Sequence, residues 1–249
     1  MMRLARALAL AGIDSRRKCE THILNGAVSV NGEIVRDLGR QVDLENDAIL
    51  FRNKILQFEK MVYFVLFKPE GYATTAADPH ERKTVYDLLP RTLVKGSRQL
   101  KSNRTRVFPV GRLDKNSSGL LLFTNDGNLA HRMMHPRFGI SKWYEVRLDR
   151  AVEPMALKKL LKGIVMEDGP AKAEKLVRLS RRVVRLMIRE GRKREVRRMF
   201  AHVGYDVIRL CRIAFGPLTI EGLRPGQGKF LNSREVESLR SSVLSPSVI

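Results

Sequence analysis

The stretch VGRLDKNSSGLLLFTNDG, residues 110–127, carries the clearest structural pattern in the chain. Ser117–Gly119 has the composition of a turn, and the unbroken apolar run Leu120–Phe123 predicts a short buried strand. Asn125–Gly127 predicts a second turn that leads into a helix. Asp114 is therefore expected on a loop just ahead of a core strand, where a carboxylate either performs chemistry or merely stabilises a turn through a neighbouring cation.

The sequence on both sides of this stretch alternates between strand and helix patterns. VYFVLF after Met61 predicts a strand with which a new domain begins, and this strand is expected to end at the Pro and Gly turn of residues 68–71. Residues 91–106 hold six basic and no acidic residues, which predicts an exposed loop. Residues 183–190 alternate as a strand, and residues 195–203 have the period of a helix that ends at Gly204.

The first 60 residues predict two short helices followed by a hairpin. Apolar residues recur at helical spacing from Leu4 until Gly12, and Ser15 is placed to cap a second helix over residues 16–24. In AVSVNGEIV, the pair Asn31-Gly32 predicts a two-residue hairpin turn, because both turn positions need a positive φ.

The charge of the chain predicts a polyanionic partner. Its 249 residues carry 47 basic and 26 acidic side chains, a net charge of +21 that would repel itself without such a partner. Residues 1–60 contribute about +2 and the remainder about +19, so the larger domain carries most of the attraction for nucleic acid. Within the small domain, the basic residues gather near the start of the chain: Arg3, Arg6, Arg16, Arg17 and Lys18.

Membrane, disulfide and metal chemistry receive no support from the sequence. No apolar run approaches the roughly 18 residues that cross a bilayer, which predicts a cytoplasmic protein without a membrane partner. Cys19 and Cys211 are too few for a disulfide framework, and neither they nor the five histidines show the spacing of metal ligands. No metal site is expected.

GRLDKNSSGLLLFTNDG resembles the signature of the RsuA/RluB family of ribosomal RNA pseudouridine synthases. The resemblance continues through KPEG at residues 68–71, KWYEV at 142–146, EGRKREVRRMFAHVGYDVIRL at 190–210 and GPLTIEGLRPGQ at 216–227. The helix, helix and VNG hairpin of roughly residues 2–57 resemble the S4 RNA-binding module.

The resemblance implies an α/β (α+β) fold, in which an S4-like helix-hairpin domain precedes a catalytic domain with a mixed, largely antiparallel sheet. The expected boundaries are 1–57 for the S4-like domain, 58–240 for the catalytic domain and 241–249 for a C-terminal tail. It further implies that Asp114 is catalytic, that Tyr144 packs against the target base, and that Arg197 forms a buried ion pair with Asp114. Isomerising uridine needs no cofactor, because the reaction involves neither net redox change nor hydrolysis.

The expected RNA contacts combine the basic residues of the small domain with others around the implied site.

Two departures from the family pattern are mild: Ser117 replaces a threonine, and Arg194-Glu195 stand where Asn or His followed by Gln is common. The residues of these motifs favour 23S over 16S ribosomal RNA as the substrate. We expect the enzyme to be a monomer that acts on this RNA in a ribosome assembly intermediate. The candidate RNA-binding residues of the large domain are Arg112, Lys142, Arg192, Arg194 and Arg198.

Two other classes of function compete with this interpretation. A non-catalytic ribosome-assembly factor could use the S4 module and the basic cleft as a clamp, with Asp114 as a turn residue. An RNA glycosidase or nuclease would also need a carboxylate, but it would normally present a second acid, a histidine pair or a metal site nearby.

Overall fold

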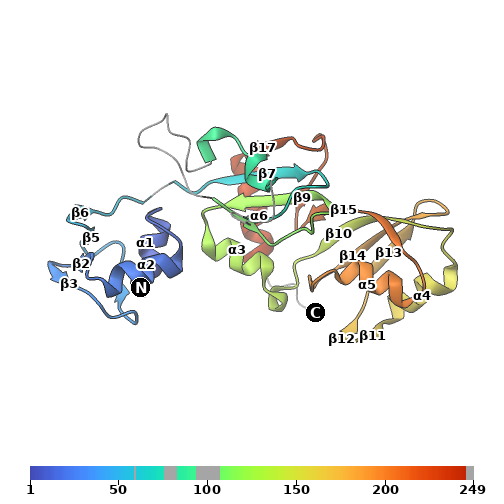
Figure 1. The fold of residues 1–249 in the computed structure, drawn as a ribbon, viewed down its shortest axis with the longest axis horizontal. Coiled ribbons are helices and arrows are strands. Elements are labelled where there is room, and N and C mark those ends of the chain that lie inside the picture. The colour runs from blue at the N-terminus through green and yellow to red at the C-terminus, as the bar shows by residue number, and fades with distance from the viewer. Residues whose placement is uncertain (59, 76–82, 94–106, 245–249) are drawn as a thin grey trace.

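The computed structural model describes residues 1–58, 60–75, 83–93 and 107–244. Figure 1 shows a small N-terminal body at one end and a larger body built around a long sheet at the other. Most of the predicted basic loop at 91–106 lies outside the described residues. The helices are α1 (Leu4–Leu10), α2 (Arg16–Leu24), α3 (Gly127–Met134), α4 (Pro154–Lys162), α5 (Glu195–His202) and α6 (Ser233–Leu244), with 3-10 turns η1 (Val85–Leu88), η2 (Arg91–Leu93) and η3 (Pro136–Phe138).

The small body follows the predicted order of two helices and a hairpin. The Ser15 side chain accepts a hydrogen bond from the Lys18 backbone N–H at 3.4 Å and caps α2, as predicted. Asn31 and Gly32 have φ angles of 52° and 89°, which confirms the predicted hairpin turn between β2 and β3. Its strands are β1 (Met2–Arg3), β2 (Val28–Val30), β3 (Glu33–Ile34), β4 (Gln41–Val42), β5 (Ile49–Phe51) and β6 (Lys54–Ile55).

Both helices of the small body bury apolar side chains against its sheet. Leu4 and Leu8 of α1 and Ile23 of α2 are fully buried and share one core with Val28 and Val30 of β2. The order β3-β2-β5-β6 describes the small sheet, and β1 pairs separately with β4. The small body therefore has a hydrophobic core of its own.

The larger body is organised around a nine-stranded sheet, counted over the described residues, in the order β13-β14-β10-β15-β9-β7-β17 with β8 and β16 attached. Every pairing in it is antiparallel except that of β15 with β9, so the sheet is mixed and largely antiparallel, as expected. The strands are β7 (Tyr63–Lys68), β8 (Phe108–Val110), β9 (Ser118–Thr124), β10 (Lys142–Leu148), β13 (Lys175–Arg178), β14 (Val183–Ile188), β15 (Val207–Phe215), β16 (Leu218–Thr219) and β17 (Gly228–Phe230). A separate hairpin pairs β11 (Ile164–Met166) with β12 (Gly169–Ala171).

Layers on both faces of β9 explain its unbroken apolar sequence. Leu120 and Leu122 pack with residues of α3 and α6, whereas Leu121 and Phe123 pack on the other face with residues around η1. Farther along the sheet, α4 and α5 cover one face of β10, β13 and β14 (Figure 1). A strand that is covered on both faces does not show the alternation of apolar and polar residues that is typical of a strand with one face exposed to solvent.

Gly119 allows the parallel pairing of β15 with β9, which places the loop of Asp114 beside β15. Gly119 is paired with Arg212, and its φ is 114°. A Cβ atom at residue 119 would lie 2.3–2.8 Å from the backbone of Arg212, so no other residue fits there without displacing a strand.

The C-terminal helix extends beyond the expected domain boundary. A tail was expected from residue 241, yet α6 continues to Leu244, and Val243 is 4% exposed and packs in the core with Leu239. The remaining residues 245–249 lie outside the described part of the chain. Across the described residues, no helix combines the length and the apolar content that crossing a membrane requires.

Candidate active site

A cavity of about 880 Å³ opens where the loop of Asp114 meets β10, β15 and the start of α5. Leu113 and Leu210 provide apolar wall, and both belong to the core cluster that continues beneath α5. Six of the residues predicted from the sequence line this cavity: Asp114, Tyr144, Arg112, Lys142, Arg192 and Arg194.

The loop of Asp114 is held through its backbone. The Ser117 N–H donates to the Asp114 carbonyl at 3.0 Å and closes a turn, and the Thr74 hydroxyl donates to the Leu113 carbonyl at 2.7 Å. The Gly71 N–H donates to the Lys115 carbonyl at 2.8 Å. Among the described residues, no hydrogen bond or ion pair occupies the half-buried carboxylate of Asp114. The carboxylate is therefore fixed in place while its oxygens stay available to a substrate.

Lys68, at the end of β7, lies at the centre of the contacts that hold the loop of Asp114. Its side chain is completely buried, and its ammonium group donates to the carbonyls of Asp114 (3.1 Å), Lys115 (3.3 Å), Ser117 (2.6 Å) and Pro69 (3.1 Å). Burial lowers the pKa of Lys68 to about 8, against the opposing charges of Glu70 and Asp114. From the sequence, residues 68–71 were predicted as a turn and matched to the family pattern, but this role of Lys68 was missed. A lysine directly at the end of an apolar strand was the signal that could have indicated it.

Tyr144 lies on β10 and points into the same cavity. It is 7% exposed and stands between Leu186 of β14 and Arg212 of β15 in the register of the sheet. Side chains of directly paired residues share one face of a sheet, so Tyr144 and Arg212 form adjacent parts of the cavity wall. Arg212 was not predicted from the sequence either, because only the register places it there.

Arg197 does not form the predicted buried ion pair with Asp114. Its guanidinium donates to the Val207 carbonyl at 2.6 Å and to the Asn116 carbonyl at 2.7 Å. Within the part of the chain that the structure describes, no ion pair of 4.0 Å or less joins the two charged groups. Burial lowers the pKa of Arg197, the charge of Arg194 adds to this, and the charge of Asp114 opposes it. Arg197 thus supports the loop through Asn116, two residues beyond Asp114.

The loop before α5 holds its basic residues in two ways. Arg194 is exposed, adopts a left-handed backbone with φ of 52° and lines the cavity. The guanidinium of Arg192 instead bonds Asp168 at 3.0 Å and the Pro170 carbonyl at 2.6 Å, and Arg198 bonds the same Asp168 at 2.7 Å. Arg192 and Arg198 were expected to present their charges to RNA. In the structure their guanidinium groups bond residues of the β11–β12 hairpin instead.

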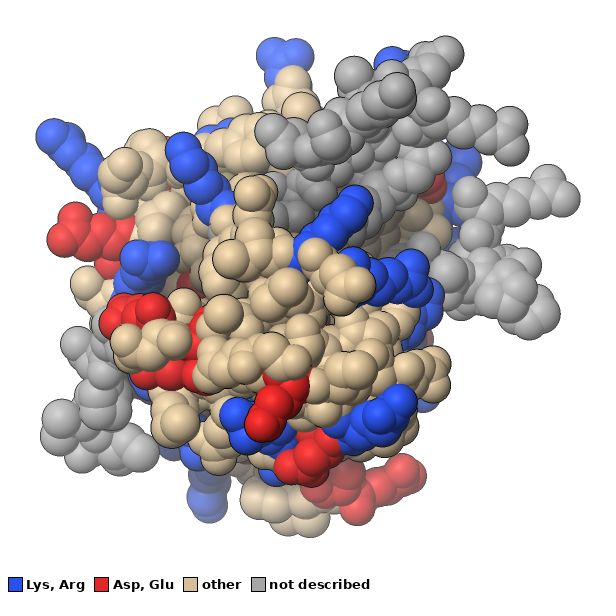
Figure 2. Space-filling model, turned by 90° about the vertical axis from the view of Figure 1, so that its left-hand side faces the viewer, with Lys and Arg blue, Asp and Glu red and all other residues tan. Residues whose placement is uncertain are grey.

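The basic residues of the small body are less one-sided than the sequence suggests. Arg3, Arg16, Arg17 and Lys18 are exposed and Arg6 is half-buried. Acidic neighbours partly offset two of them, since Arg16 lies 3.6 Å from Glu20 and Lys18 lies 3.9 Å from Asp14. Figure 2, which faces this end of the molecule, accordingly shows basic and acidic side chains interspersed.

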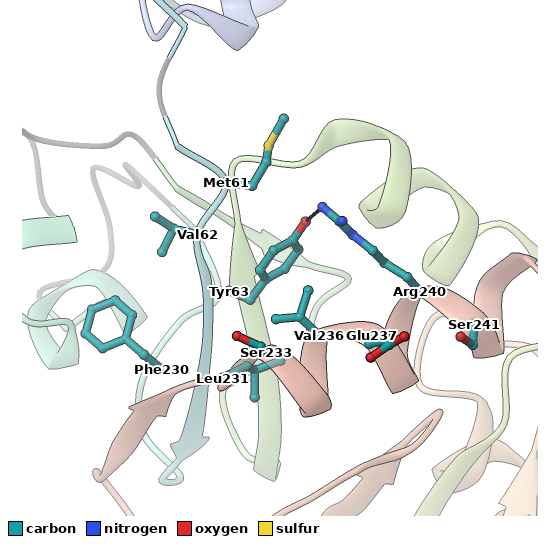
Figure 3. A pocket seen from close by; sticks show the side chains of 10 residues that line it. All are labelled: Met61, Val62, Tyr63, Phe230, Leu231, Ser233, Val236, Glu237, Arg240 and Ser241. Atoms are coloured by element: carbon teal, nitrogen blue, oxygen red, sulfur yellow. Dashed lines mark hydrogen bonds between the residues drawn. The ribbon is translucent and has the colours of Figure 1, made fainter.

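A second cavity, of about 770 Å³, lies at the opposite end of β7 between β17 and α6 (Figure 3). Its prominent polar groups bond one another: Arg240 donates to the Tyr63 hydroxyl at 2.9 Å, and that hydroxyl donates to Asp126 at 2.8 Å. None of the predicted site residues lines it. The cavity with Asp114 is the better candidate for chemistry.

Comparison with known proteins decides the family. Residues 62–202 match the family described as RNA pseudouridylate synthase, and residues 2–49 match the S4 domain. The chain belongs to the RNA pseudouridine synthase family. It is 40% identical to "Ribosomal large subunit pseudouridine synthase B" of Bacillus subtilis, over 97% of this chain and 96% of that protein.

Two further relatives of this synthase agree. An "Uncharacterized RNA pseudouridine synthase" of Aquifex aeolicus is 39% identical over 97% of the chain and 95% of that protein. A crystal structure of a pseudouridylate synthase matches with a TM-score of 0.66 at 31% identity, covering 96% of this chain and all of that one. The predicted family and fold class are thereby confirmed, and the protein is an enzyme that isomerises uridine in RNA to pseudouridine.

Proposed function

We propose that this synthase converts a uridine of ribosomal RNA to pseudouridine, with Asp114 as its catalytic carboxylate. The observation that carries the proposal is the position of Asp114: its backbone is bonded by Lys68 and its half-buried carboxylate lines a cavity together with Tyr144. The name of the relative in Bacillus subtilis favours the large ribosomal subunit, hence 23S RNA, as the source of the substrate.

The chemistry requires little beyond one fixed carboxylate. The bond between N1 of uracil and C1′ of the sugar breaks, the base turns over, and C5 bonds to C1′. Asp114 beside the sugar can stabilise its positive charge, add to it covalently, or take a proton to give a glycal. In each route water must be excluded, because it would otherwise hydrolyse the cleaved sugar. Leu113 and Leu210 form apolar wall suited to that task.

The remaining residues are assigned roles around this reaction. Tyr144 packs against the target base, and Arg197 positions the catalytic loop through the Asn116 carbonyl. Arg112 and Arg194, which are exposed and line the cavity, contact the RNA backbone at its rim. Residues 1–57 act as the S4 RNA-binding domain and residues from 58 onward as the catalytic domain. The enzyme acts as a cytoplasmic monomer on a ribosome assembly intermediate.

One experiment tests the proposal and its alternatives. Pseudouridine is mapped along all ribosomal RNA from cells with and without the gene. A single 23S site that disappears with the gene and is restored by the purified enzyme supports the proposal. Disappearance of a 16S site instead favours the small-subunit alternative. An unchanged map contradicts a ribosomal RNA substrate altogether and restores the non-catalytic assembly factor as the better account of this chain.

A further inference from the structure

Two buried cationic side chains form the wall of the cavity next to Tyr144. Arg212 is 2% exposed and Lys142 is 7% exposed, and both line the cavity. Arg212 is the direct partner of Tyr144 across β15 and β10, and Lys142 precedes Tyr144 by two residues on β10. All three side chains therefore lie on one face of the sheet.

The cation of Arg212 is fixed in place but incompletely bonded. Its Nε donates to the Leu120 carbonyl at 2.8 Å, and its guanidinium carbon lies 4.9 Å from the ring centre of Phe215. The ammonium group of Lys142 lies 5.4 Å from the same ring and donates to the Arg189 carbonyl at 3.0 Å. Nη2 of Arg212 is buried and has no hydrogen-bond partner in the part of the chain that the structure describes.

The positive charge of this wall is not balanced by a direct counter-charge. Burial lowers the pKa of Lys142 to about 8, and the charge of Arg212 adds to that effect, whereas Glu195 and Glu190 oppose it. The buried Glu195 is itself bonded by Arg192 at 3.0 Å and 3.5 Å. Among the described residues, no carboxylate lies within 4.0 Å of either cation. Buried charges are normally paired, so a bound ligand is expected to bring the missing negative charge.

We propose that Arg212, supported by Lys142, binds the carbonyl edge of the target uracil and stabilises the negative charge that the base acquires during isomerisation. This inference rests on the proposed function. When the N1–C1′ bond breaks, its electron pair stays on uracil, and the anion spreads over N1, O2 and O4. That electron density then forms the C5–C1′ bond, the proton on C5 leaves to solvent, and N1 takes up a proton, so that the product is an isomer of uridine. A fixed cation beside the ring stabilises the anion until the new bond forms.

The position of the two cations favours the base over a phosphate as their ligand. Arg112 and Arg194 are exposed at the cavity and can reach the RNA backbone, whereas Arg212 and Lys142 are buried beside Tyr144. A ligand group must therefore enter the cavity to reach Arg212 and Lys142. A base packed on Tyr144 would bring O2 or O4 toward its cross-strand neighbour Arg212.

The test compares Arg212→Met and Arg212→Lys with Arg209→Met, a matched control on an exposed residue of the same strand. The substrate is the ribosomal RNA fragment that the wild type modifies, made with uridine, 2-thiouridine or 4-thiouridine at the target. Single-turnover rates and RNA affinity are measured for each pair, and thermal unfolding checks the fold. We expect Arg212→Met to lower the single-turnover rate of the enzyme–RNA complex by a factor of about 10²–10³, with little change in RNA affinity. Arg212→Lys should recover part of that rate.

The sulfur-substituted RNAs distinguish contact with the base from other roles. In the wild type one thio substitution should slow the reaction, and in Arg212→Met it should have no further effect, because the donor is already missing. Equal thio effects in both proteins would overturn the proposal. So would a variant that binds RNA more weakly, with a salt slope smaller by about 0.7–0.9, while reacting normally once bound, since Arg212 would then hold a phosphate.

Two further outcomes are covered by the design. If Arg212→Met does not fold, Lys142→Met is measured in its place, with a slower rate and little change in affinity again expected, and a normal single-turnover rate in it overturns the proposal. A wild-type enzyme that leaves every ribosomal uridine unchanged contradicts the proposed function instead. The two failures are therefore distinguishable.

Discussion

The ammonium group of Lys68 lies 3.1 Å from the backbone carbonyl of Asp114, although the two residues are 46 positions apart in the chain. The same group reaches the carbonyl of Ser117 at 2.6 Å, on the other side of the turn. Asp114 is thus positioned by a buried cation that bonds its backbone. This arrangement fixes the loop without using the carboxylate oxygens that the chemistry needs.

Replacing Lys68 should reduce stability and activity together. Lys68→Met leaves several buried carbonyls without their donor, which should cost about 2–4 kcal/mol of unfolding free energy and greatly slow turnover. Urea unfolding and pseudouridine formation measure the two effects. Lys158→Met, on the exposed side of α4, is the matched control and should change neither. A stable, fully active Lys68→Met would show that other contacts hold the loop.

The burial of Lys68 also predicts how stability changes with pH. Its pKa falls from 10.5 in the unfolded chain to about 8 in the folded protein. Between these values the unfolded state binds more protons, so the unfolding free energy should rise with pH. The cost of burying the charge is fully present below about pH 8 and is relieved as the pH approaches 10.5.

The check is urea unfolding at several values of pH from 7 to 10 in the wild type and Lys68→Met. Lys142, whose pKa is also about 8, contributes to the rise in both proteins. The wild type should therefore show the steeper rise with pH. Identical pH dependence in the two proteins would mean that Lys68 is not desolvated in the folded state.

Local patterns predicted the elements of this fold well because neighbouring residues determine them. The positive φ angles of Asn31 and Gly32 follow from the turn chemistry of Asn-Gly, and the unbroken run Leu120–Phe123 follows from burial on both faces of β9. The position of Asp114 before a core strand was predicted in the same way.

Contacts between distant segments were not predictable from these patterns. Lys68 reaches a loop 46 residues away, and Arg212 faces the cavity only through its register with Tyr144. For Arg197 the family resemblance located the right region but implied the wrong partner, because carbonyls of Asn116 and Val207 occupy its guanidinium. Sequence patterns identify the loop that bears the carboxylate, but they do not show which side chains hold that loop.

Arg197 should act as a support for the loop. Arg197→Met removes two charge-assisted hydrogen bonds and should lower the unfolding free energy by about 3 kcal/mol as well as the rate. Arg197→Lys can reach only one of the two carbonyls, so it should retain more stability than activity. Arg198→Ala, which loses a bond to Asp168 outside the cavity, should show only a modest fall in RNA affinity. Normal turnover in Arg197→Met with inactivity of Arg198→Ala would reverse this assignment.

The basic residues of the small body should add RNA affinity without affecting chemistry. Changing Arg16, Arg17 and Lys18 to alanine should weaken RNA binding and flatten its salt dependence by about 0.7–0.9 in log–log slope for each phosphate that is no longer bound. Because Arg16 and Lys18 have acidic neighbours, Arg17 should account for the largest single effect. Lys54→Ala, on exposed β6, serves as the control. A slope unchanged in the triple variant would show that these residues face solvent in the complex.

The most direct measurement is pseudouridine formation by Asp114→Asn on the ribosomal RNA that the wild type modifies. The amide keeps the shape of the side chain but removes its charge, and the backbone bonds from Lys68 do not depend on that charge. The variant should therefore unfold at the wild-type temperature and bind RNA within about twofold of wild type, while its rate falls by at least about 10³. Turnover of Asp114→Asn at or near the wild-type rate would contradict the assignment of Asp114 as the catalytic carboxylate.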